Sequence, residues 1–65
     1  MGWLKELRIA KGLTGSAVSA EAGITQQMYN YVENGKRSPS VTVAKRIAAV
    51  LGFDWTRFFD DEKTA

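Results

Sequence analysis

Uncharged side chains with hydrogen-bonding groups gather in one short stretch of the chain, residues 26–31. If this stretch is helical and turns Tyr29 inward, five side chains stay outside: Gln26, Gln27, Met28, Asn30 and Tyr31. Glutamine and asparagine amides can form paired hydrogen bonds with adenine N6 and N7 in the major groove of DNA, and methionine can contact a thymine methyl group. Tyrosine can reach a base edge or a phosphate. The pattern therefore favours the reading of base edges, and the alternative is a polar surface that only faces solvent.

Groups that can hold phosphates lie on both sides of this stretch. Lys36 and Arg37 follow it in a predicted loop, and Asn34 and Gly35 offer backbone N–H groups in the same turn. Before it, Thr14 precedes the free N–H groups of a predicted helix start, which is an anion site by geometry. We therefore predict phosphate contacts from Thr14, Gly15, Ser16, Thr25, Asn34, Lys36 and Arg37. The alternative for the two cations is ordinary surface charge.

The composition argues against an enzyme, a metal site and a cofactor. The 65 residues include no cysteine and no histidine, which removes thiolate ligands, disulfides and the commonest general base. The acids Asp60, Asp61 and Glu62 lie together at the chain end rather than in a cleft, and no glycine-rich phosphate loop is present. A net charge of +2 permits nucleic-acid binding without arguing strongly for it. The absence of cysteine fits a reducing compartment, so we expect a cytoplasmic protein. No apolar run approaches the ~18 residues of a membrane span.

Helix-period hydrophobicity and capping residues predict an all-α fold. A chain of this size can bury about 60% of its surface, enough for one small core. The predicted N-caps are Thr14, Thr25, Ser40 and Asp54, and the predicted helix ends are Gly12, Gly23, Gly35 and Gly52. The predicted helices cover about residues 2–11, 15–22, 26–34 and 41–51, and a short fifth helix carries Trp55, Phe58 and Phe59.

The second and third predicted helices are joined by a very short turn. Gly23 ends one helix, Ile24 turns inward, and Thr25 begins the next helix. So short a turn forces the helices to cross steeply and exposes the N-terminal end of the second. The small side chains of Ser19 and Ala22 let the two backbones approach. This is the geometry of a helix-turn-helix.

Three segments resemble the phage-repressor-like helix-turn-helix domains, also called the xenobiotic-response-element family. They are residues 4–14 (LKELRIAKGLT), 22–27 (AGITQQ) and 33–40 (ENGKRSPS). The resemblance covers about residues 4–59 and implies a compact five-helix, lambda-repressor-like DNA-binding domain of a bacterial or phage regulator, of repressor type. In this family the N-terminal positions of the third helix read bases, which carries over to Gln26 and Gln27 directly and to Tyr31 less closely.

Two details of the resemblance concern single positions. Many family members carry glutamine directly after the threonine at position 14, aimed at a phosphate, whereas this chain has Gly15. One positioning contact is therefore lost or supplied by Ser16. In the family an arginine of the first helix pairs with the glutamate that opens the Glu-Asn-Gly turn, which implies an ion pair between Arg8 and Glu33. The alternative is two independent surface charges.

The expected partner is double-stranded DNA, bound by a homodimer, because repressors of this type usually occupy two half-sites. Trp55 and Phe59 are the candidate dimer contact, with packing in the core as the alternative. Residues 1–59 are expected to form the DNA-binding domain, and residues 60–65 an acidic tail that avoids phosphates.

A competing function is a protein-interaction module on the same fold, such as an antitoxin or a regulatory partner. A protein-docking face should carry a large apolar anchor, and only Met28 and Tyr31 approach that on the third helix. The first predicted helix follows Met1 directly, so we expect a natural start. The chain is either a complete small regulator or the DNA-binding part of a longer repressor.

Overall fold

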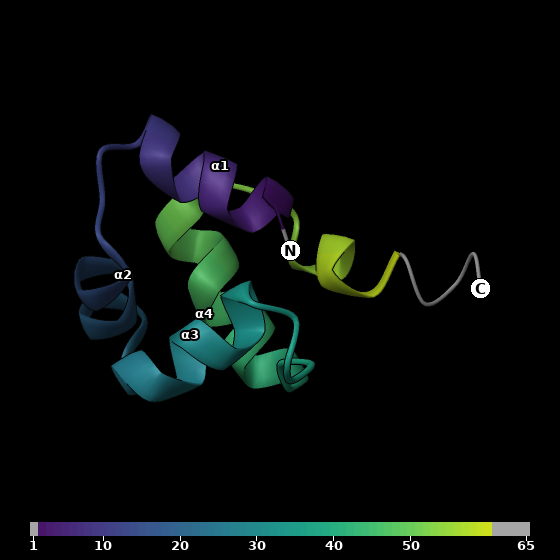
Figure 1. Cartoon of the computed structure of the whole chain (residues 1–65). Helices are drawn as coiled ribbons and strands as arrows, with labels where there is room; N and C mark the ends of the chain where they lie inside the picture. The colour runs from purple at the N-terminus through teal and green to yellow at the C-terminus, as the bar shows by residue number, and fades with distance from the viewer. Residues whose placement is uncertain (1, 61–65) are drawn as a thin grey trace.

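The computed structural model describes residues 2–60, which form four α-helices and one 3-10 helix. The elements are α1 (Gly2–Ala10), α2 (Gly15–Ala22), α3 (Gln26–Glu33), α4 (Val41–Leu51) and η1 (Trp55–Phe59) (Figure 1). The all-α prediction is confirmed, and the ends of the four α-helices lie within one residue of those predicted. Of the predicted acidic tail, residues 61–65 lie outside the described residues.

The predicted short fifth helix is present after Asp54, and it is a 3-10 helix. The Asp54 carboxylate accepts two hydrogen bonds from Thr56. The Thr56 backbone N–H donates at 3.0 Å and the Thr56 hydroxyl at 2.8 Å. The backbone N–H of Arg57 donates to the Asp54 carbonyl at 3.0 Å, an i to i+3 bond. Short elements often wind as 3-10 helices, and the tight Asp54 cap favours this winding here. These hydrogen bonds to the carboxylate lower the pKa of Asp54.

Local capping chemistry sets where the α-helices begin and end. The hydroxyl oxygens of Thr14, Thr25 and Ser40 accept hydrogen bonds from backbone N–H groups three residues later, at 3.1, 3.1 and 3.2 Å. Each satisfies a donor that the first helical turn leaves without an intrahelical partner. The four predicted end glycines all have a positive φ, between 69° and 77°.

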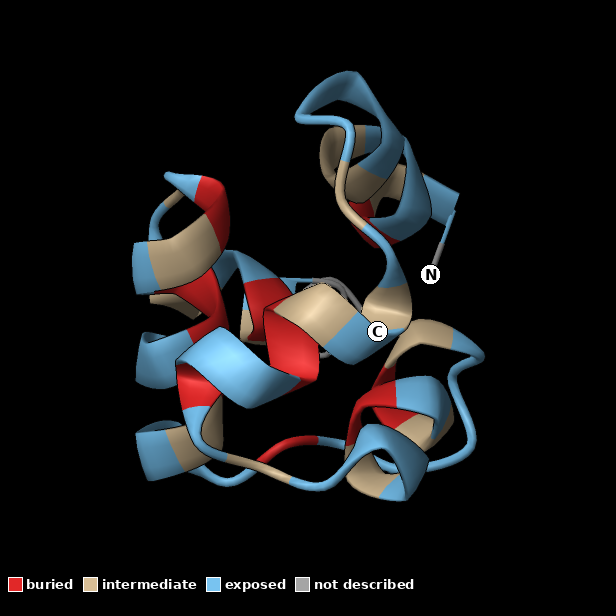
Figure 2. Cartoon of the chain, turned by 90° about the vertical axis from the view of Figure 1, so that its left-hand side faces the viewer, coloured by how far each residue is buried: buried red, intermediate tan, exposed pale blue. Residues whose placement is uncertain are grey.

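The core lies where α4 crosses the other helices. In Figure 1, α4 runs through the middle of the molecule, with α1 above it and α2 and α3 beside and below it. Most of the buried segments in Figure 2 appear as short bands on the helices, as expected for amphipathic helices that share one core. The core cluster consists of Leu4, Val18, Ala22, Tyr29, Val32, Ala44, Ile47, Leu51 and Phe58.

A group of aromatic rings attaches η1 to the start of α1. Trp3, Phe53 and Phe58 lie with ring centroids 5.2 to 5.3 Å apart, in tilted or edge-on contacts. The Arg57 guanidinium lies 4.4 Å from the Trp3 ring centroid. These contacts join the two ends of the described chain over the core. None of the helices in residues 2–60 is long and apolar enough to cross a membrane.

Candidate nucleic-acid interface

The turn between α2 and α3 is built from local hydrogen bonds. The N–H groups of Gly23 and Ile24 donate to the carbonyls of Ala20 and Ser19 at 3.3 and 3.0 Å, which closes the end of α2. Ser19 is buried at the helix crossing and donates its hydroxyl to the Ser16 carbonyl at 2.9 Å. A small, internally satisfied side chain at this point lets α3 lie close across α2, and Gln26, Gln27 and Asn30 on the outer face of α3 remain exposed.

Burial divides α3 into an inner and an outer face. Tyr29 and Val32 are fully buried, as predicted. Gln26, Gln27 and Asn30 are exposed, whereas Met28 and Tyr31 are half-buried. Met28 packs against the core cluster at the edge of the inner stripe, so it is less available than the other predicted base-reading residues. The structure therefore brings Gln26, Gln27, Asn30 and Tyr31 together on a face without a charged side chain.

Two of these residues contact each other. The Nε2 atom of Gln27 donates a hydrogen bond to the Oη atom of Tyr31 at 3.0 Å. The two residues are four positions apart, which places them on the same helix face one turn apart. The sequence contained the spacing that allows this bond, but sequence reasoning treated the two residues separately.

The loop after α3 carries the predicted cations. The N–H groups of Lys36 and Arg37 both donate to the Tyr31 carbonyl, at 2.8 and 3.3 Å. Their side chains are exposed beside the end of α3. The N–H groups of Asn34 and Gly35 donate to the carbonyls of Asn30 and Val32, at 3.0 and 3.1 Å. The prediction that these two N–H groups are offered to phosphate is therefore wrong, because the end of α3 uses them; the exposed Asn34 side chain can still take that role.

The predicted phosphate-binding residues at the helix starts also have structural roles. The Thr14 and Thr25 oxygens accept capping bonds, but a hydroxyl that accepts still has its proton to donate. Gly15 and Ser16 open α2, where helix geometry leaves the first N–H groups without an intrahelical acceptor. A Cβ atom at position 15 would lie 3.4 Å from the Tyr29 ring and 3.5 Å from Asn30 Oδ1, so the start of α2 lies next to α3.

Arg8 and Glu33 form an ion pair that connects α1 to α3. The Arg8 Nε atom donates to Glu33 Oε1 at 2.8 Å, and the two side chains are only 15% and 12% exposed. Arg8 Nη1 also donates to the Leu13 carbonyl at 3.0 Å, and the Tyr29 hydroxyl donates to Glu33 Oε1 at 3.3 Å. The hydrogen bond with Glu33 raises the pKa of Arg8. The pair holds α3 and the segment before α2 in one arrangement.

Burial, and secondarily the negative charge of Glu33, raises the pKa of Tyr29 to about 12. Because an unfolded tyrosine ionises near pH 10, the neutral phenol stabilises the fold fully below about pH 10, and this contribution is lost as the pH rises towards 12. The free energy of unfolding should therefore fall more steeply between pH 10 and 12 in the wild type than in Tyr29→Phe. Urea unfolding at several pH values would measure this, and parallel curves for the two proteins would contradict it.

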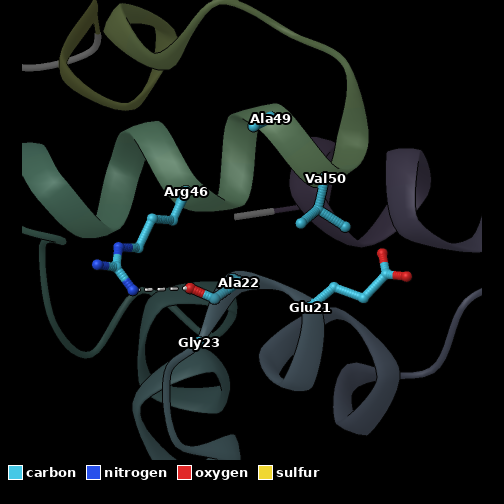
Figure 3. A pocket seen from close by; sticks show the side chains of 6 residues that line it. All are labelled: Glu21, Ala22, Gly23, Arg46, Ala49 and Val50. Atoms are coloured by element: carbon cyan, nitrogen blue, oxygen red, sulfur yellow. Dashed lines mark hydrogen bonds between the residues drawn. The ribbon is translucent and has the colours of Figure 1, made fainter.

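Arg46 is a residue that sequence reasoning missed. From α4 it reaches the end of α2, where its Nη1 atom donates to the Ala22 carbonyl at 3.4 Å (Figure 3). A Cβ atom at Gly23 would lie 2.8 Å from the same nitrogen, and Gly23 has a φ of 72°. Only glycine therefore fits without adjustment at this point of the turn. The contact joins residues 24 positions apart, so no local sequence pattern predicts it.

A shallow groove surrounds this contact. Its volume is about 640 Å³, and Figure 3 shows the residues that line it: Glu21, Ala22, Gly23, Arg46, Ala49 and Val50. All of them belong to α2, the turn and α4, so the groove is separate from the outer face of α3. Within residues 2–60 no group of three or more acidic side chains could hold a metal ion.

The short turn between α2 and α3 and the exposed outer face of α3 define a helix-turn-helix domain. Comparison with known protein families gives the same class. Residues 4–58 match the helix-turn-helix family HTH_3, and the chain belongs to that family. DNA binding in transcription regulation is therefore its function class.

Two relatives carry the name of a transcriptional regulator. A Bacillus subtilis (strain 168) protein named as an uncharacterized HTH-type transcriptional regulator, YqaF, is 51% identical over 59 residues, which cover 91% of this chain and 78% of that protein. A second such regulator, from Methanothermobacter thermautotrophicus, is 39% identical over 49 residues, with 75% and 71% of the two chains covered.

A solved structure has the same fold. The crystal structure of an HTH_3 family transcriptional regulator from Vibrio cholerae matches with a TM-score of 0.72 and 30% sequence identity. The match covers 94% of this chain but 34% of that chain, so this chain spans about a third of its length.

Proposed function

We propose that this chain is a repressor that reads operator DNA by placing α3 in the major groove. The observation that carries the proposal is the outer face of α3, where Gln26, Gln27, Asn30 and Tyr31 offer donors and acceptors with no charged side chain among them. An α-helix fits the major groove, where each base pair presents its own pattern of donors and acceptors. Repression would follow from occupancy of the operator.

Phosphate contacts on both sides of α3 would orient the domain. Lys36 and Arg37 lie beside the end of α3, and the start of α2 adjoins it through Gly15. Such contacts carry little sequence information but fix the register of the helix on the duplex. Each neutralised phosphate should contribute about −0.9 to the slope of log K against log salt concentration.

Gly15→Gln should raise DNA affinity by roughly threefold to tenfold, because it supplies the phosphate-directed amide that many family members carry at this position. Position 15 does not have a positive φ, and a Cβ atom there meets only van der Waals contacts, so the side chain can be accommodated. The salt slope should not change, because glutamine adds no charge.

Gly15→Ala is the matched control for Gly15→Gln, because it adds the Cβ atom without the amide. Fluorescence anisotropy with a specific duplex would measure both variants. Equal affinities for Gly15→Gln and Gly15→Ala would contradict the phosphate contact.

A homodimer on two half-sites completes the proposal. Trp55 and Phe59 are half-buried, with ring centroids 6.1 Å apart, and Lys45 lies over the Trp55 ring at 5.2 Å from its centroid. Partly exposed aromatic rings suit an interface between two copies. Half-sites would then be centred about one DNA turn apart, roughly 34 Å. The proposed place of action is the cytoplasm, with double-stranded DNA as the partner.

The proposal is tested by selection from a randomised duplex pool. The protein is mixed with the pool at several salt concentrations, and the bound fraction is sequenced. Binding that weakens steeply with salt concentration and enriches one sequence motif supports a regulator that reads an operator. A palindromic motif supports the dimer. Binding that weakens steeply with salt concentration but enriches no sequence motif contradicts sequence-specific reading. No binding even at low salt favours a protein partner instead, with Trp55 and Phe59 as the first surface to mutate.

A further inference from the structure

We propose that Tyr31 is a positioning residue for Gln27, so that the two side chains act as one unit that selects an A·T base pair. This inference rests on the proposed function, since it concerns how α3 reads DNA. The observation behind it is the 3.0 Å hydrogen bond from Gln27 Nε2 to Tyr31 Oη on the exposed face of α3.

Tyr31 is the better anchored of the two residues. Gln27 is exposed and has three rotatable side-chain bonds, whereas Tyr31 is half-buried and has two. The Tyr31 carbonyl also accepts the N–H groups of Lys36 and Arg37, which ties its backbone to the loop that carries the proposed phosphate contacts. A hydrogen bond to Tyr31 therefore restricts the Gln27 amide before DNA arrives, which lowers the entropy lost on binding.

The direction of the hydrogen bond determines which base the amide matches. Nε2 has two N–H groups, and one of them is given to Tyr31 Oη. The other N–H and the Oε1 acceptor remain, and they match the N7 acceptor and the N6 donor of adenine. Guanine presents acceptors at both N7 and O6, so it would leave Oε1 facing another acceptor. The reverse arrangement, with Oε1 facing Tyr31, would offer two N–H groups and favour guanine.

The test compares the wild type, Tyr31→Phe, Gln27→Ala and the double variant. Selection from the randomised pool first identifies the base pair at which Gln27→Ala loses discrimination, and the four duplexes that differ at that pair are then titrated. The wild type should prefer A·T there. Tyr31→Phe should reduce this preference by about fivefold, the effect of one net hydrogen bond. Discrimination at the other base pairs should be unchanged, and the double variant should discriminate no worse than Gln27→Ala alone.

Thermal unfolding of Tyr31→Phe is the folding control, and a melting temperature equal to that of the wild type is expected because the hydroxyl is on the surface. Unchanged discrimination in Tyr31→Phe, equal weakening on all four duplexes, or a wild-type preference for G·C would overturn the inference while leaving the proposed function intact. A wild-type chain that enriches no sequence would overturn both.

Discussion

Glu33→Ala should lower the free energy of unfolding by about 3 kcal/mol, the lower end of the range for breaking a buried ion pair. Glu33 Oε1 accepts hydrogen bonds from Arg8 Nε at 2.8 Å and from the Tyr29 hydroxyl at 3.3 Å. Alanine would leave a largely buried guanidinium without its carboxylate and the tyrosine hydroxyl without its acceptor. A domain of this size has a total stability of roughly 3–10 kcal/mol, so the variant should be close to unfolding. Urea denaturation of both proteins measures the difference.

Two controls separate the ion pair from a general effect of removing charge. Glu21→Ala removes an exposed carboxylate from α2 and should change stability by less than about 0.5 kcal/mol. The double variant Arg8→Met with Glu33→Leu should recover much of the loss, because apolar replacement of both partners leaves no buried charge unpaired. If Glu33→Ala proves as stable as Glu21→Ala, Arg8 and Glu33 contribute nothing to holding α1 and α3 together.

Gln27→Ala should lose about 1–3 kcal/mol of discrimination at one base pair, which corresponds to roughly 5- to 150-fold. The reason is that a glutamine amide on the exposed face of α3 can form two hydrogen bonds with a single base, whereas alanine can form none. Duplexes altered at other base pairs should keep the same order of affinity as with the wild type. Titration of a specific duplex and its single-base variants measures the effect.

Arg37→Ala is the counterpart of Gln27→Ala, because its side chain is exposed in the loop beside α3 rather than on the reading face. It should weaken binding to all duplexes alike and reduce the salt slope by about 0.9. If both variants weakened every duplex by the same factor, the assignment of base reading to α3 and of phosphate binding to the loop would be wrong.

Local features of this protein were predictable because their causes are local. The Thr14, Thr25 and Ser40 caps act within three residues, and glycine permits the left-handed backbone that ends a helix. The period of the apolar residues likewise identified Tyr29 and Val32 as the inner face of α3. The 3-10 winding of η1 was not predicted, because a short segment can adopt either helix and the tight Asp54 cap decided between them.

The candidate interface was predictable as a set of residues but not as an arrangement. The residue types showed that α3 carries amides and that Lys36 and Arg37 follow it. They did not show that Met28 would be partly covered, or that the end of α3 would use the N–H groups of Asn34 and Gly35. Both depend on side chains and carbonyls whose positions follow from how the whole helix packs.

The sequence by itself determined the helix order, the helix ends, the chemistry of the α3 face and, through its resemblance to a family, the helix-turn-helix. Only the tertiary structure decided the contacts between distant segments: the 2.8 Å pair of Arg8 with Glu33 and the bond from Arg46 to the Ala22 carbonyl. It also decided that Gln27 and Tyr31 bond to each other rather than only share a face. The physical reason is that capping and periodicity depend on neighbours along the chain, whereas these contacts require the core to place separate helices together.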